Sequence, residues 1–138
     1  YGLILGWTAI KGHIDVVTII FYIGAIFWTL GYDTIYGYQD IKDDEIIGIK
    51  STSIKFKNKP RKFLLICYSI FLLNLLITGY LMKLSSFFYL IFILIILQMF
   101  YFQLKKLNIK NSLECLAIFK SNNLLGLLVL ISLIGSKI

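Results

Sequence analysis

The chain has 138 residues, of which 59% are hydrophobic and 15% are charged. Soluble domains carry about 25% charged residues, so the composition excludes most soluble folds and favours an integral membrane protein. The net charge of +7 would suggest a nucleic-acid partner in a soluble chain. No separate basic domain with RNA-binding aromatic residues is present in the sequence, so we expect no nucleic-acid partner and assign the excess charge to cytoplasmic loops.

Apolar blocks follow one another along the chain. The stretch at residues 1–10 predicts a partial helix, and residues 16–32, 63–82 and 87–104 are uncharged and long enough to cross the roughly 30 Å core of a bilayer as α-helices. A fourth long block runs from about residue 119 to residue 135. The sequence therefore predicts an all-α, multi-pass transmembrane helical bundle of about four full helices plus a partial one, in a single domain over residues 1–138.

Basic residues gather in alternate loops. Seven of them lie between residues 33 and 62 and three more between residues 105 and 110, whereas the opposite side holds only Lys11, Lys83 and Lys137. Because the cytoplasmic loops of membrane proteins are enriched in Lys and Arg, this asymmetry places the 33–62 loop in the cytoplasm. Within the spans, we expect Asn74 and Gln98 to bond to neighbouring helices and Trp28 to face lipid or the membrane interface.

The 33–62 loop begins with a cluster of acids. Five of the seven Asp and Glu residues of the chain fall between residues 33 and 45. If the preceding helix continues, 100° per residue places Asp33, Tyr36, Asp40 and Asp44 within an arc of about 80°. Carboxylates at this spacing repel one another, and more strongly beside a membrane, where less water screens them. The pattern favours a bound cation, although a solvated acidic turn that caps a helix remains an alternative.

Oxygen-only ligands without His or Cys indicate Mg²⁺ or Ca²⁺. Mg²⁺ takes one or two carboxylates together with phosphate oxygens, and the pair Asp40 and Asp44 suits that chemistry. The candidate metal ligands are therefore Asp40 and Asp44, with Asp33 as a third. Lys50, which follows the cluster, is a candidate phosphate contact.

The residues of this loop match a known pattern. Residues 33–44, DTIYGYQDIKDD, resemble the second Asp-rich motif of UbiA-type intramembrane aromatic prenyltransferases, D-x-x-Y-A-x-x-D-x-x-x-D, with Gly37 in place of the alanine. Residues 48–52, GIKST, are similar to a segment of the 4-hydroxybenzoate polyprenyltransferase branch. Residues 119–126, FKSNNLLG, are also similar to that branch.

The resemblance implies an enzyme that transfers a polyprenyl group from polyprenyl diphosphate to 4-hydroxybenzoate in ubiquinone synthesis, with Mg²⁺ on the diphosphate. It assigns Tyr36 and Lys50 as catalytic residues and Asn122 and Asn123 as substrate-binding residues. It also implies about nine helices around a cavity in the bacterial inner membrane, with the acidic loop facing the cytoplasm. The family's first motif, N-D-x-x-D-x-x-x-D, is absent from the printed sequence, so the resemblance implies the C-terminal half of an enzyme, with the N-terminal half as its partner.

Three alternatives stay open on the sequence. The aromatic acceptor can be another one, such as the naphthoate of menaquinone synthesis. The chain can be a catalytically inactive fragment. The carboxylates can also form the ion site of a cation-transport fragment, although transporters place ionisable residues near the middle of the bilayer, whereas these acids follow the end of a helix.

Overall fold

A computed structural model describes residues 2–136, apart from the side chain of Lys42. Tyr1, the first residue of the predicted partial helix, and Lys137, used for the loop charges, lie outside the described residues. The described chain is helical in eight segments: α1 Gly2–Lys11, α2 Val16–Gly37, α3 Ile41–Ile47, α4 Thr52–Phe56, α5 Pro60–Leu81, α6 Ser86–Leu97, the π-helical η1 Gln98–Leu104, and α7 Ser112–Gly135.

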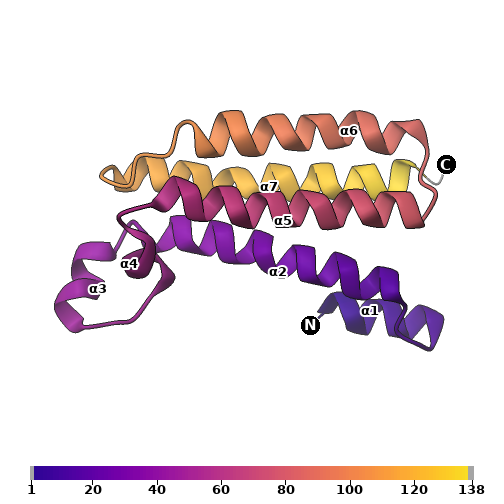
Figure 1. Ribbon diagram of the computed structural model, residues 1–138, viewed down its shortest axis with the longest axis horizontal. Helices are drawn as coiled ribbons and strands as arrows, with labels where there is room; N and C mark the ends of the chain where they lie inside the picture. The colour runs from indigo at the N-terminus through magenta and orange to yellow at the C-terminus, as the bar shows by residue number, and fades with distance from the viewer. Residues whose placement is uncertain (1, 137–138) are drawn as a thin grey trace.

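Four of these helices are long and apolar enough to cross a membrane, namely α2, α5, α6 continued by η1, and α7. They run side by side along the long axis of the molecule, and the short α1 folds back beside the start of α2 (Figure 1). This arrangement confirms the predicted all-α bundle of four full helices and a partial one. The length and apolar composition of these four helices are those of an integral membrane protein.

The ends of the helices differ from the sequence expectation at two places. The last helix begins at Ser112, several residues before the predicted start, because the Asn111 side chain caps it by accepting hydrogen bonds from the backbone N–H groups of Leu113 and Glu114. The helix that follows the basic loop begins with Pro60 in its first turn, where the missing N–H of proline costs no helical hydrogen bond. An asparagine cap in one helix and a proline in the first turn of the other thus accompany the extension of two spans into polar sequence.

The two loops that carry most of the bases meet at one end of the bundle. The chain from α2 to α5 lies there, folded into α3 and α4, and so does the connection from η1 to α7 (Figure 1). The α1–α2 and α5–α6 connections lie at the other end. The topology therefore agrees with the alternation of loop charges along the sequence.

Packing of α2 against α5 depends on a close approach at Gly31. A Cβ atom at Gly31 would lie 2.8 Å from Cε1 of Tyr68, a distance that real Cβ contacts do not reach. The Tyr68 ring is fully buried at this point. Without a side chain at position 31, α2 comes close enough for the large ring to pack on its backbone, which places Tyr68 in the centre of the bundle.

Candidate active site

The acidic segment does not continue the helix of α2. The helix α2 ends at Gly37, and the backbone N–H groups of Tyr38 and Gln39 donate to the carbonyls of Ile35 and Tyr36 in a tight turn. Asp40 then stands at the N-cap of α3 with φ −108° and ψ 13°, outside the helical region. The expected single helical stripe from Asp33 to Asp44 is therefore wrong, because the helical register is lost between Tyr36 and Asp40.

Two contacts explain why the helix breaks here. The Tyr38 side chain is buried in the core, which turns the chain inward just after α2. Burial, with a smaller contribution from the Cys115 thiol, raises the pKa of Tyr38 to about 12, so its hydroxyl stays protonated. Gly37 packs directly on Ser53, where a Cβ atom would meet the Ser53 hydroxyl oxygen at 2.2 Å.

The exchange Gly37→Ala, which restores the alanine of the family pattern, is expected to destabilise this protein. Overpacking against the buried Ser53 should lower the free energy of unfolding by about 1–3 kcal/mol. Thermal melting in detergent measures the effect. The double variant Gly37→Ala/Ser53→Ala removes the clashing oxygen and should melt above the single variant. An unchanged melting temperature for Gly37→Ala alone would contradict the close packing.

Asp40 and Asp44 form a pair at the start of α3. The Asp44 N–H donates to the Asp40 carbonyl over 2.9 Å, so the two residues are one helical turn apart on the same face. The Asp40 side chain caps no backbone N–H. Such a pair matches the one or two carboxylates that Mg²⁺ takes alongside phosphate oxygens and water. The local geometry therefore fits a divalent cation held by Asp40 and Asp44.

Asp33 lies apart from this pair. It sits on α2 and lines a cavity of about 460 Å³ with Leu3 of α1 and Leu30 of α2. Across residues 2–136, no three side chains of His, Cys, Asp or Glu converge into a metal-binding group. The structure thus keeps Asp40 and Asp44 one helical turn apart in the chain and leaves Asp33 on another helix.

The segment that carries Lys50 links α3 to a helix, α4, that is attached to the end of α2. Gly48, at φ 80°, ends α3 in the left-handed conformation, and Ser51 caps α4 by accepting from the Ile54 N–H. The hydroxyls of Thr52 and Thr34 then lie 2.8 Å apart, and Ser53 donates to the Thr34 carbonyl at 3.0 Å. These bonds attach α4 to the end of α2. Lys50 itself is exposed between α3 and α4.

An aromatic column runs along α2 toward the acidic turn. Trp28, Tyr32 and Tyr36 are spaced by four residues on α2, and the rings of Tyr32 and Tyr36 lie 5.9 Å and 4.8 Å from the ring of Phe119 on α7. Tyr36 is 46% exposed, so one side of its ring stays open. The column ends beside the turn that leads to Asp40. Tyr36 therefore presents an aromatic face at the end of α2, whereas the carboxylates lie on α3.

Trp28 does not face lipid as expected. Its ring stacks on Phe71 of α5 at a centroid distance of 5.2 Å, and its indole N–H donates to Asn122 Oδ1 of α7 at 2.9 Å. The lipid-facing interpretation is wrong because α7 offers a buried acceptor opposite the indole. Asn74 also differs from the expectation, since it donates to the Ile70 carbonyl of its own helix.

Asn122 is the centre of a buried polar network. Its Oδ1 accepts from Trp28 and, at 3.2 Å, from Gln103 Nε2 of η1. Its Nδ2 donates to the carbonyls of Ile118 and Phe119. Gln103 is fully buried and in turn accepts a hydrogen bond from the Tyr68 hydroxyl of α5. Four helical segments are joined in this way, and the hydrogen-bonding groups of Asn122 are used within the protein.

Asn123, its neighbour, is exposed on the next face of α7. Gln103 and Tyr68 were not among the sequence candidates. A glutamine near the end of an otherwise apolar span was the available signal for Gln103, but its partners come from two other helices, α5 and α7, which no local pattern indicates. The structure therefore assigns Asn122 a positioning role next to the aromatic column.

Comparisons with known proteins identify the family of this chain. The sequence model of the UbiA prenyltransferase family matches residues 1–129. The chain belongs to the UbiA prenyltransferase family. The resemblance seen in the Asp-rich motif is thereby confirmed, and the four membrane-spanning helices are those of a family of prenyltransferases.

Curated relatives carry names from one branch of the family. A "4-hydroxybenzoate octaprenyltransferase" of Francisella tularensis subsp. mediasiatica (strain FSC147) is 39% identical over 135 residues, which cover 95% of this chain and 46% of the relative. A "4-hydroxybenzoate polyprenyltransferase, mitochondrial" of Dictyostelium discoideum is 34% identical over 139 residues, covering 100% of this chain and 30% of the relative. The chain thus spans about half the length of the Francisella relative. No solved structure matches this UbiA-family chain.

Proposed function

We propose that this chain takes part in transferring a polyprenyl group from polyprenyl diphosphate to 4-hydroxybenzoate, in the synthesis of ubiquinone. The proposal is carried by the Asp40–Asp44 pair, which stands at the start of α3 just after the turn that follows α2, in a chain of the UbiA family. The names of the relatives support the choice of 4-hydroxybenzoate as the acceptor. Family membership favours this transferase over a cation-transport fragment.

In this proposal Asp40 and Asp44 hold Mg²⁺ against the diphosphate. The metal, when bound, supplies Lewis-acid stabilisation of the charge that develops on the leaving group. Lys50 adds a positive contact to the phosphates, whereas Asp33 lies apart on α2 and belongs to no group of three metal-ligating side chains within residues 2–136. The hydrogen bonds that attach α4 to Thr34 keep the loop with Lys50 close to the end of α2.

The aromatic column is proposed to stabilise the prenyl group when its bond to diphosphate breaks. An allylic group that loses diphosphate becomes cationic, and aromatic faces attract cations, most strongly where water is excluded. Tyr36 offers such a face, and Phe119 supports it from behind. The acceptor ring would lie on the α7 side, with Asn123 as its candidate contact. Asn122 takes no direct part but holds Trp28 in position.

We also propose that the catalytic cavity needs a further segment, corresponding to the N-terminal half of the relatives, which supplies the first Asp-rich motif. The relatives are about twice as long as the region they share with this chain, which supports such a partner. Without that segment, the chain is expected to bind Mg²⁺ weakly and to be inactive. The proposed location is the bacterial inner membrane, with α3 and α4 on the cytoplasmic side, where the loop charges favour it.

The acceptor is tested in membranes that contain the whole protein. Addition of a polyprenyl diphosphate and Mg²⁺ with labelled 4-hydroxybenzoate is expected to give a lipid-soluble product. A dihydroxynaphthoate acceptor is expected to give at least about tenfold less, because an acceptor site that fits a single ring excludes a fused pair of rings. Extraction of the label into organic solvent measures both. Preferential prenylation of the naphthoate would move the chain to the menaquinone type, and an absence of transfer to either acceptor would overturn the proposed function.

A further inference from the structure

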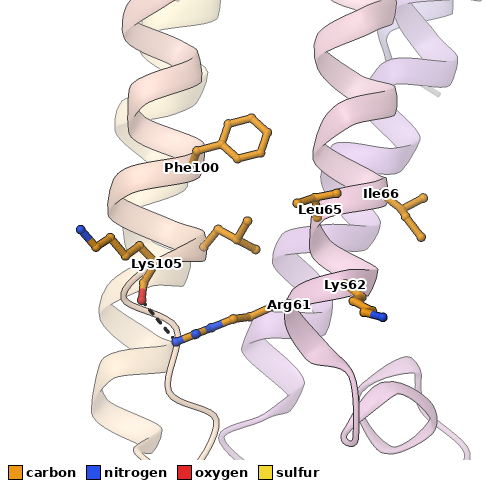
Figure 2. A pocket seen from close by; sticks show the side chains of 7 residues that line it. Arg61, Lys62, Leu65, Ile66, Phe100 and Lys105 are labelled. Carbon is orange, nitrogen blue, oxygen red and sulfur yellow. Dashed lines mark hydrogen bonds between the residues drawn. The ribbon is translucent and has the colours of Figure 1, made fainter.

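A groove lies on the outer surface of the bundle, where α5 passes η1. It has a volume of about 610 Å³ and is lined by Leu65, Ile66, Phe100 and Leu104 together with Arg61, Lys62 and Lys105. Leu65 and Phe100 point into the space between the two helices from opposite sides, and Arg61 spans its end (Figure 2). The groove therefore has apolar walls and a basic end.

A second cavity, of about 400 Å³, continues the groove at its basic end. The two cavities share Arg61 and Lys62, and the second is otherwise lined by residues 58–60 and 107–110, in the loops before α5 and after η1. The walls of the first cavity belong to membrane-spanning helices, and the walls of the second belong mainly to polar loops. The combined space thus crosses from the acyl-chain level to the headgroup level of a membrane.

The charge of this space has one sign. The residues that line the two cavities include five bases and no acid. Arg61 is held in place because its Nη2 donates to the carbonyls of Lys105 and Leu107 at 3.4 Å and 3.2 Å. The Arg61 side chain crosses the end of the groove, whereas the side chains of Lys62 and Lys105 start from opposite helices and extend away from the space between them (Figure 2). An anion at the end of the groove would meet Arg61 directly, with one flexible lysine on each flanking helix.

The π-helical turn aligns the two walls. In α5, Leu65 lies one turn above Arg61. In η1, the Lys105 N–H donates to the Phe100 carbonyl at 3.1 Å, a bond between residues five apart that places Lys105 one wide turn below Phe100. Each wall therefore carries a base one turn below an apolar side chain. A ligand that carries an anionic group at the end of apolar chains can contact the bases and the apolar side chains of both walls at the same time.

We propose that this groove binds an anionic phospholipid, with its phosphate between Arg61, Lys62 and Lys105 and its acyl chains along Leu65 and Phe100. A water-soluble anion would make no contacts with the apolar walls that lie within the membrane span. The ammonium group of a zwitterionic lipid would have no acidic side chain to pair with among the lining residues. Basic pockets between membrane helices on the cytoplasmic side suit acidic headgroups. The site is separate from the Asp40–Asp44 pair and does not depend on the proposed function.

The test uses the whole protein in nanodiscs that contain equal amounts of phosphatidylglycerol and phosphatidylcholine, released for native mass spectrometry. The double variant Lys62→Gln/Lys105→Gln removes two bases of the groove and leaves Arg61 and its loop bonds intact. The matched control Lys55→Gln/Lys106→Gln removes the same charge from bases that do not line the groove; these lie over the rings of Phe56 and Phe102, as Lys105 lies over the ring of Tyr101. Thermal melting of both variants checks that they fold.

The unchanged protein and the control are expected to retain phosphatidylglycerol in preference to phosphatidylcholine. In the groove variant the ratio of bound phosphatidylglycerol to bound phosphatidylcholine is expected to fall by at least about tenfold. Equal retention of both lipids by the unchanged protein, or an equal loss in both variants, would overturn the proposal. Geranyl diphosphate is added in a second arm. Displacement of phosphatidylglycerol by geranyl diphosphate would show a prenyl-diphosphate site in this groove and would also overturn the proposal.

Discussion

Exchange of Asp40 or Asp44 for asparagine in the whole protein is expected to lower the rate of prenyl transfer by about 10²–10³-fold. The two carboxylates lie one turn apart at the start of α3 and together form the proposed magnesium site. Removal of one charge weakens the hold on the metal that stabilises the leaving diphosphate, a contribution of several kcal/mol. Product formation from labelled 4-hydroxybenzoate, measured over a range of Mg²⁺ concentrations, gives both the rate and the metal requirement.

Asp43→Asn is the matched control for this experiment. Asp43 lies in the same first turn of α3 and is exposed, so it contributes a similar charge to the helix N-terminus without belonging to the i, i+4 pair. Its exchange should change the rate by less than about tenfold. Membrane fractionation must show equal insertion of all variants. Retained turnover in both Asp40→Asn and Asp44→Asn would defeat the metal assignment.

The second large effect is expected on stability. Asn122→Ala removes the acceptor shared by the Trp28 indole and the Gln103 amide, and both donors are left without this partner inside the bundle. An unsatisfied buried donor costs about 1–3 kcal/mol, so we expect a loss of about 2–4 kcal/mol in the free energy of unfolding. The melting temperature in detergent, followed by circular dichroism, measures the loss.

Asn123→Ala tests the difference between the two asparagines. Asn123 is exposed on the next face of α7, so its removal should leave the melting temperature within a few degrees of the unchanged protein. If it contacts the acceptor, the KM for 4-hydroxybenzoate should rise. The opposite result, a stable Asn122→Ala variant with a raised KM, would make Asn122 a substrate-binding residue and contradict its positioning role.

The amino-acid sequence alone was sufficient for several features. The hydropathy of successive blocks gave the four membrane spans and the partial helix, because every residue of a span must be compatible with the same apolar solvent. The loop bases correctly grouped the connections into two ends of the bundle. The Asp-rich motif indicated the family, and the one-turn spacing of Asp40 and Asp44 depends only on local helix geometry.

Tertiary structure decided what local periodicity cannot determine. The break after Gly37 depends on the packing of Ser53 from α4 and on the burial of Tyr38, and it separates Asp33 and Tyr36 from the carboxylate pair. Gln103 meets Tyr68 and Asn122 only because three segments distant in sequence come together. The apolar pattern of a sequence indicates which residues can face lipid or the core. The hydrogen-bond partner of a polar residue inside a bundle depends on which helices are neighbours, and this is determined only when the helices pack together.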